Sequence, residues 1–254
     1  MTHILLAREG AVATVTLDRP ERLNAISTSL TEELHQVLFE VNDDPDIRVV
    51  VLNGNGRAFC AGDDLQEFGL QTASRAATVR HIENIQRITR DLMFSDKLVV
   101  GAVHGYAVGG GFEWLLNCDL VVAADDLVAF FPETEWGQFP TGGVTRLLPQ
   151  TLGHQHAMEL LVLGERQTAG ALLDRRLVNW VVPRDQMMAK ALSVARTAAS
   201  RSPFSVSALK RLMTREISPG LERALSAEER VTIAAFGTGE ARARSANFPV
   251  GKKT

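Results

Sequence analysis

Two glutamates in the middle of the chain occupy positions where carboxylates could do acid–base chemistry. Glu113 comes two residues after the glycine triplet 109–111, and Glu133 follows the segment Phe-Phe-Pro at 130–132. A glutamate near a helix start is ordinarily a favourable surface charge, but both of these lie in apolar stretches. Two carboxylates in different surroundings can divide the roles of general base and general acid between them. These two glutamates are the candidate catalytic pair.

Two glycine turns supply main-chain N–H groups for the same chemistry. The strand predicted at 98–103 leads into the glycine triplet, and the strand predicted at 47–52 leads into a turn in which Gly62 precedes Asp63. Each turn is expected to open a helix, whose first N–H groups are unpaired and lie at the positive end of the helix dipole. Two converging N–H groups form an oxyanion hole, which stabilises negative charge on a carbonyl oxygen. The alternative is that the glycines only allow close packing of strand and helix.

Other kinds of site fit the sequence less well. The segment GYAVGGG is neither GxGxxG nor GxxxxGK[ST], so a nucleotide phosphate loop is not expected. The serine hydrolase motif GxSxG is absent from the sequence. His154 and His156 lie in a helical pattern without a cluster of carboxylates, so no metal site is expected. His104 is interpreted as a hydrogen-bonded structural residue.

Composition limits the classes of protein to consider. The 254 residues are 45% hydrophobic, which is enough for one large domain or one domain with a small appendage. The net charge of −3 and the pI near 6.1 do not predict nucleic-acid binding. Without a signal peptide or an apolar run near the roughly 18 residues of a spanning helix, no membrane association is expected. Cys60 and Cys118 lack metal-type spacing and predict buried, reduced thiols in a cytoplasmic protein.

Hydrophobic periodicity predicts the elements that must position these groups. Alternating residues at 4–17 predict a β-hairpin, and helical spacing predicts a helix up to Val41, with Ser29 and Glu32 as its capping box. The runs at 47–52 and 98–103 are continuously apolar and predict strands buried on both faces.

The succession of strand, glycine turn, helix and strand predicts an α/β fold. After residue 144 helical patterns dominate. We place a boundary near residue 190, between an α/β core at 1–190 that holds the site and a helical region at 191–254.

Three segments resemble, in order and spacing, the motifs of one known family. They are AFCAGDDLQEF, HGYAVGGGFEWLLNCDLVVAAD and FPETEWGQFPTGG, which begin at residues 58, 104 and 131. On these motifs the chain resembles the enoyl-CoA hydratase/isomerase, or crotonase, family from about Arg19 to at least Pro183. The resemblance implies a crotonase-like spiral of ββα units. It also implies a helical C-terminal trimerisation region, and therefore a homotrimer or a hexamer.

The resemblance implies an acyl-CoA thioester as substrate and assigns roles at the motif positions. The N–H groups of Asp63 and Gly110 would hold the thioester oxygen and stabilise an enolate. Glu113 would activate water, and Glu133 would exchange a proton at the α-carbon. The implied reaction is reversible hydration of a 2-enoyl-CoA, in which coenzyme A is part of the substrate and no metal or redox cofactor takes part.

The resemblance also suggests contacts with coenzyme A and leaves other reactions open. The expected contacts are the backbone around Cys60, Ala61 and Asp63 for the adenine, together with Arg22, Phe248 and Lys252. Double-bond isomerisation, C–C cleavage and thioester hydrolysis pass through the same enolate and remain alternatives. A family member that binds acyl-CoA or a protein partner without turnover is a further alternative.

Further expectations concern other residues in or near the three motifs. Thr141 stands where relatives that isomerise dienoyl-CoA tend to have an aspartate, which favours hydration. Glu135 is interpreted as a solvated or ion-paired residue, and Asp64 as the cap of a helix that begins near Leu65. The segment 68–97 is expected to shape the acyl pocket, with candidate walls at Trp114, Trp136 and Phe139.

Overall fold

The N-terminal hairpin forms as predicted and begins a six-stranded sheet. The structure is a computed structural model that describes residues 2–216, 220–237 and 240–245. Strand β1 (Ile4–Glu9) pairs antiparallel with β2 (Val12–Leu17), and every later neighbour in the order β1-β2-β3-β4-β6-β9 is parallel. The later strands are β3 (Val49–Gly54), β4 (Leu98–Val103), β6 (Leu120–Ala124) and β9 (Trp180–Val182).

A second, three-stranded sheet brings the two glutamate-bearing segments together. It has the order β5-β7-β8, with β5 (Tyr106–Val108) parallel to β7 (Val128–Phe130) and β8 (Gln167–Thr168) antiparallel to β7. In this register Val108 is the partner of Phe130. Since the carboxyl ends of parallel neighbours meet at one edge, the chain that follows each strand starts from the same place.

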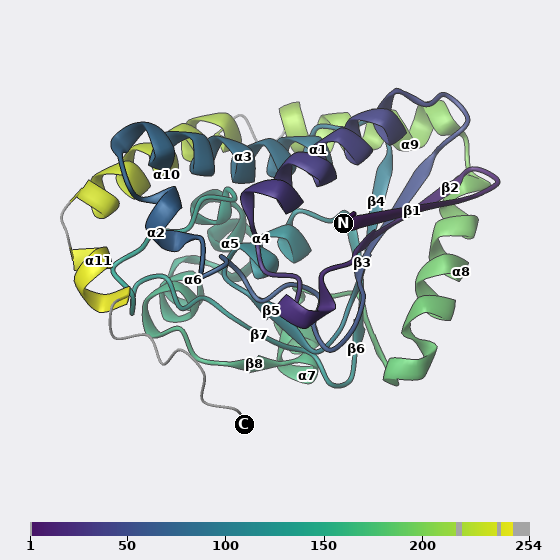
Figure 1. Cartoon of the computed structure of the whole chain (residues 1–254). Coiled ribbons are helices and arrows are strands. Elements are labelled where there is room, and N and C mark those ends of the chain that lie inside the picture. The colour runs from purple at the N-terminus through teal and green to yellow at the C-terminus, as the bar shows by residue number, and fades with distance from the viewer. Residues whose placement is uncertain (1, 217–219, 238–239, 246–254) are drawn as a thin grey trace.

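Helices cover both faces of the large sheet (Figure 1). Helices α1 (Thr28–Asp43) and α3 (Arg75–Met93) lie side by side, with α1 packed on the hairpin. Helix α8 (Met187–Ala199) packs against β3, β4 and β6 from the opposite face. Strand β3 is buried at every position, as its continuous apolar run predicts. The boundary expected near residue 190 falls inside α8, and this helix continues through it without a break.

The cap of α1 is two residues earlier than the sequence pattern predicts. Ser27 has an extended backbone, and its Oγ accepts the N–H of Leu30 at 3.1 Å. Ser29, the predicted cap, already lies in the first helical turn. The prediction failed because Ser27 and Ser29 can both serve as caps by type, and only the backbone at Ser27 turns out of the helix.

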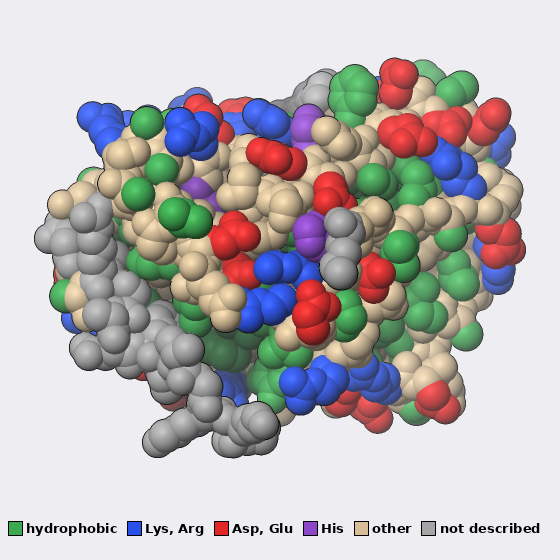
Figure 2. Space-filling model, viewed as in Figure 1, with side chains coloured by type: hydrophobic (Ala, Val, Ile, Leu, Met, Phe, Trp, Pro, Cys, Tyr) green, Lys and Arg blue, Asp and Glu red, His purple; other side chains and the backbone are tan. Residues whose placement is uncertain are grey.

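The remaining elements are mostly helical, as predicted for the chain after residue 144. None of the described helices is both long enough and apolar enough to span a membrane. On the face shown in Figure 2, acidic and basic side chains are interspersed over the described residues. The remaining α-helices are α2 (Phe68–Gln71), α4 (Gly110–Leu116), α5 (Val144–Leu152), α6 (His154–Met158), α7 (Ala169–Asp174), α9 (Pro203–Arg211), α10 (Leu221–Gly237) and α11 (Glu240–Ser245). Short 3-10 helices span Pro20–Arg22 and Arg184–Gln186, and π-helical turns span Glu159–Leu163 and Leu212–Glu216.

A buried lysine attaches the C-terminal helices to the large sheet. Lys210 of α9 is 5% exposed, and its Nζ lies 2.8 Å from Asp119 Oδ2. The same Nζ donates to the carbonyl oxygens of Leu92 (2.6 Å) and Lys97 (2.8 Å). Asp119 also accepts the N–H of Val99 at 2.7 Å, as expected for an acid that satisfies a buried donor.

We predict that Lys210→Met lowers the free energy of unfolding by about 3–5 kcal/mol, because it leaves the Asp119 carboxylate and two carbonyls without their buried donor. Urea denaturation measures this change. Arg211→Met is the matched control, since Arg211 forms an exposed ion pair with Asp96, and should cost about 1 kcal/mol or less. Equal effects of the two substitutions would contradict the structural role of Lys210.

Candidate active site

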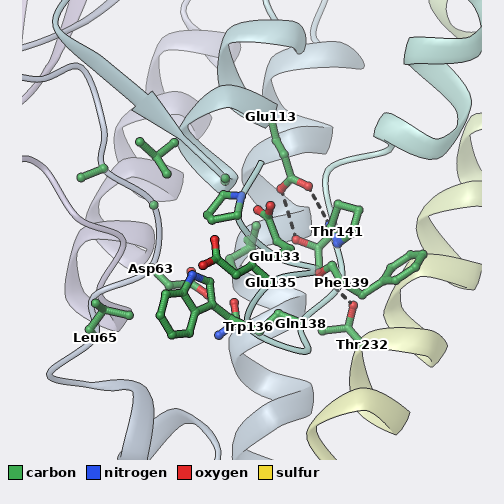
Figure 3. Close-up of a pocket in the computed structure, with 18 of the residues that line it drawn as sticks. Asp63, Leu65, Glu113, Glu133, Glu135, Trp136, Gln138, Phe139, Thr141 and Thr232 are labelled. Carbon is green, nitrogen blue, oxygen red and sulfur yellow. Dashed lines mark hydrogen bonds between the residues drawn. The ribbon is translucent and has the colours of Figure 1, made fainter. Parts of the chain in front are cut away.

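One cavity of about 340 Å³ collects the predicted acids and amides (Figure 3). Its walls come from the turn at 61–65, the start of α4, the loop at 130–141, and side chains of α3 and α10. Trp136 and Phe139 line it as predicted. Glu135, interpreted from the sequence as a solvated or ion-paired residue, also lines it. Trp114, a residue of α4 predicted as a wall, is not among the lining residues, because its side chain is fully buried in the core.

The pairing of β5 with β7 places the two candidate acids in this cavity. Strand β5 runs through Gly109 into α4, which carries Glu113 in its first turn, while β7 leads to Glu133. The N–H of Gly109 donates to the carbonyl of Phe130 at 3.0 Å and continues the alignment of the two strands. In Figure 3 the carboxyl groups of Glu113 and Glu133 extend toward the same space.

The glycine triplet allows two segments of main chain to approach very closely. The N–H of Cys60 donates to the carbonyl of Tyr106, and the N–H of Val108 donates to the carbonyl of Cys60, both at 3.0 Å. A Cβ at Gly111 would lie 2.3 Å from the Cys60 oxygen, which no side chain could accommodate. The triplet therefore serves close packing, and that packing brings the turn at 61–65 alongside the start of α4.

Two N–H groups at this junction lack a protein acceptor. Asp63 and Gly110 both line the cavity, and within the described residues neither N–H donates a hydrogen bond. Gly110 is the first residue of α4, where the helix leaves its N–H free and adds the positive end of its dipole. Each of these N–H groups is therefore available to donate to an acceptor in the cavity.

The helix predicted directly after Gly62 is wrong. The chain from Ala61 to Glu67 is a loop, and α2 begins only at Phe68. A parallel bridge fixes the loop instead: Ile26 donates to the carbonyl of Gly62 at 2.8 Å, and Asp64 donates to the carbonyl of Ile26 at 3.0 Å. The groups that form this parallel bridge belong to the residues on either side of Asp63, the C=O of Gly62 and the N–H of Asp64. The N–H of Asp63 itself points away from Ile26, so within the described residues it stays unpaired without a helix.

Glu113 is a buried acid held by the loop at 140–145. Its Oε1 accepts the N–H of Thr141 at 2.7 Å, and its Oε2 lies 3.3 Å from the Thr141 hydroxyl, which donates to it. Burial and, second, the charge of Glu228 together raise the pKa of Glu113 to about 7, against the lowering effect of the main-chain donors. The sequence left open whether burial or the helix N-terminus would dominate this pKa, and in the structure burial dominates.

Glu133 differs from Glu113 in its hydrogen bonding. Its Oε2 is buried and has no hydrogen-bond partner among the described residues. Burial raises the pKa of Glu133 well above its usual value, and the neighbouring Glu113 charge raises it further. The Oε1 atom stands 2.5 Å from where a Cβ at Gly109 would be, so only glycine leaves room for this carboxyl.

Sequence reasoning missed two residues that hold the loop behind Glu113. Glu228 of α10 is 1% exposed and accepts the N–H groups of Gly143 (2.7 Å) and Thr145 (2.9 Å), which caps the start of α5. Gln86 of α3 donates to the carbonyl of Thr141 at 3.2 Å. Glu228 lies in the charged stretch AEER, so its local sequence indicates an exposed helix face and gives no signal of burial.

The residues expected to contact coenzyme A are only partly at the cavity. Ala61 and Asp63 line it, but Cys60 is fully buried and its N–H and C=O are both used in the bridge to β5. Arg22 is partly exposed and forms an ion pair with Asp64 at 3.0 Å. Phe248 and Lys252 lie outside the described residues.

Asp64 does not cap a helix as predicted. Its Oδ1 accepts the N–H of Gln66 at 3.0 Å within a turn that precedes α2. Its carboxylate also pairs with Arg19 at 2.7 Å in addition to Arg22, and these partners lower its pKa despite burial. Asp64 therefore ties two arginines to the 61–65 turn.

Comparison with known proteins gives a consistent result over nearly the whole chain. Residues 7–248 match the sequence model of the enoyl-CoA hydratase/isomerase family. A probable enoyl-CoA hydratase of Mycobacterium tuberculosis is 31% identical over 235 residues, which cover 92% of this chain and 90% of that protein. A short-chain-enoyl-CoA hydratase of Clostridium acetobutylicum is 30% identical, over 94% of this chain and 91% of that protein.

Solved structures show the same fold. An enoyl-CoA hydratase/isomerase from Mycobacterium paratuberculosis superposes with a TM-score of 0.91 at 25% identity, over 98% of this chain and 99% of that one. OdaA of Pseudomonas aeruginosa gives a TM-score of 0.89 at 28% identity, over 99% and 100% of the two chains. The fold is the crotonase fold, as the sequence motifs predicted. By sequence, by fold and by the two strand ends that meet at one cavity, this chain belongs to the enoyl-CoA hydratase/isomerase family.

Proposed function

We propose that the protein catalyses the reversible hydration of a 2-enoyl-CoA thioester. The observation that carries this proposal is the presence of two buried carboxyl groups, Glu113 and Glu133, in the same cavity as two unpaired N–H groups. Hydration needs one group to take a proton from water and another to give a proton to the α-carbon. Relatives named enoyl-CoA hydratase at about 30% identity support the same reaction.

In the proposed mechanism the main chain stabilises the enolate. The thioester oxygen accepts hydrogen bonds from the N–H groups of Asp63 and Gly110, which have no other acceptor in the described chain. As water adds to the β-carbon, the electron pair of the double bond moves toward this oxygen. Fixed donors stabilise that charge without reorganising during the reaction.

The two acids then divide the proton transfers. Glu113 accepts the N–H of Thr141, which favours its ionised form, whereas Glu133 Oε2 has no hydrogen-bond partner among the described residues, so we assign Glu133 as the group that keeps its proton. Glu113 is the base: it takes a proton from water as the oxygen bonds to the β-carbon. Glu133 gives its proton to the α-carbon, and the product is a 3-hydroxyacyl-CoA.

We predict that Glu113→Gln and Glu133→Gln each lower the hydration rate by about 10²–10⁴-fold, because each removes one proton-transfer group without changing volume. Loss of the conjugated enoyl absorbance, measured with short, medium and aromatic enoyl-CoA esters, gives the rate. Glu135→Gln is the control, since Glu135 lines the same cavity but is exposed, and should have a much smaller effect.

More than a tenth of the activity left in either glutamine variant would remove that glutamate from the mechanism. Binding of the esters by the unmodified protein without any spectral change would favour a binding protein over an enzyme. A shift of the double bond without addition of water would favour an isomerase.

The pH dependence of the rate tests the assignment of Glu113 as base. Since Glu113 must be ionised and its pKa is raised to about 7, the rate at low substrate should fall as the pH drops through about 7. Glu228→Gln removes a negative charge that raises this pKa, so the midpoint should move to lower pH. Glu229→Gln, one residue further along α10, should leave the midpoint in place. An unchanged midpoint in Glu228→Gln would contradict the electrostatic coupling.

We further propose that the protein works as a trimer or hexamer in the cytoplasm. Large apolar side chains are exposed on the C-terminal helices, among them Phe204, Leu209 and Met213, and clusters of this kind mark protein interfaces. Both cysteines are free, which suits a reducing compartment. Light scattering should give a mass three or six times the 27.7 kDa of one chain, and a monomer would contradict the proposal.

A further inference from the structure

A histidine faces the carboxylate of the residue that supplies one of the two cavity amides. His81 of α3 and Asp63 both line the cavity, and His81 Nε2 lies 3.5 Å from Asp63 Oδ1. The His81 side chain is 6% exposed, and its Nε2 has no hydrogen-bond partner among the described residues. The two groups are within ion-pair distance but too far apart for a strong hydrogen bond. The sequence did not indicate that His81 and Asp63 would form a pair.

The charge of Asp63 is unfavourable for the reaction proposed above. The carboxylate belongs to the same residue whose N–H would hold the developing negative oxygen, so the two charges would be neighbours. Its field reaches the reacting groups, because the Asp63 charge is one of the causes that raise the pKa of both Glu113 and Glu133. An enolate at the same place would be destabilised by the same field.

The nearby arginines do not neutralise Asp63. Arg19 and Arg22 both pair with the next residue, Asp64, at 2.7 and 3.0 Å. Asp64 is 2% exposed and is held by both of these partners. Within the described part of the chain, the basic side chain that faces the Asp63 carboxylate is that of His81, at 3.5 Å.

We propose that His81, whose Nε2 faces the Asp63 carboxylate at 3.5 Å, offsets the negative charge of this carboxylate, and that the pair keeps the proposed oxyanion site able to stabilise an enolate. His81 is then a positioning residue that acts through Asp63, and it does not exchange protons with the substrate. The inference rests on the proposed function, since it takes Asp63 as a donor to the thioester oxygen. It differs from a packing role for His81 because it requires the negative charge at Asp63.

The test uses acetoacetyl-CoA, a thioester whose enolate absorbs differently from its keto form. We expect the unmodified protein to bind part of this probe as the enolate, and His81→Gln to lower the enolate-to-keto ratio at least tenfold. The double variant Asp63→Asn/His81→Gln should recover at least fivefold over His81→Gln, because the charge that needed compensation is gone. In hydration assays His81→Gln should lower kcat at least tenfold and change KM less than threefold.

His35→Gln is the matched control. His35 of α1 faces Asp91 of α3, the helix that carries His81, at 2.6 Å, and His35 lies outside the cavity. This substitution therefore removes a histidine–aspartate pair without touching the site. The enolate ratio should stay within twofold of the unmodified protein.

Two results would overturn the inference. One is an enolate ratio in His81→Gln that stays within twofold of the unmodified protein. The other is a lowered ratio that Asp63→Asn does not rescue, which would assign His81 to packing or to direct contact with the acyl group. Because the enolate ratio needs no turnover, failure of the protein to hydrate any enoyl-CoA would contradict the proposed function while leaving this measurement informative.

Discussion

Two carboxyl groups buried in one small cavity cannot both be ionised without a large electrostatic cost, and the surrounding structure is arranged around that constraint. Glu113 receives the N–H of Thr141, which favours its charged form, whereas Glu133 Oε2 receives no donor from the described chain. The charge of Glu113 also raises the pKa of Glu133 by repulsion. The hydrogen bonds therefore favour the charged form of Glu113 over that of Glu133, and the proposed roles of base and acid follow from this difference.

The glycines explain how both acids reach that cavity. Chains that leave two parallel strands ordinarily diverge as side chains separate them, but here a carbonyl at Cys60 and the main chain at Gly111 are in direct contact. Gly109 leaves room for the Glu133 carboxyl, and at Gly142 a Cβ would lie 2.7 Å from Glu113 Cβ. Gly109 and Gly142 each face one of the two acids that act on substrate in the proposal. The sequence allows the glycine triplet to be interpreted either as a device for close packing or as part of a functional site. Both interpretations rest on the same close contacts.

The parts of the site that could be predicted from the sequence are those encoded within a few residues. The hairpin, the buried strands, the helix that carries Glu113 and the positions of both glutamates follow from local periodicity and from motifs. Glu228, Gln86 and His81 could not be found in this way, because each acts across more than 15 residues of sequence and sits on a helix with ordinary amphipathic spacing. The helix expected after Gly62 failed for a related reason. A bridge to Ile26, distant in sequence, holds that loop open.

The behaviour of Glu113 shows which physical effect controls this site. It lies in the first turn of α4, where the helix dipole should lower the pKa of a carboxyl group. Instead the pKa is raised, so removal from water and the negative charges nearby outweigh both the dipole and two hydrogen bonds. A site of this kind responds strongly to any single charge at its wall, because both of its acids are buried from solvent. That sensitivity lets Glu228, which touches neither acid directly, raise the pKa of Glu113. In the proposed mechanism it also makes the charge of the Asp63 side chain matter to an oxygen bound by the main chain of the same residue.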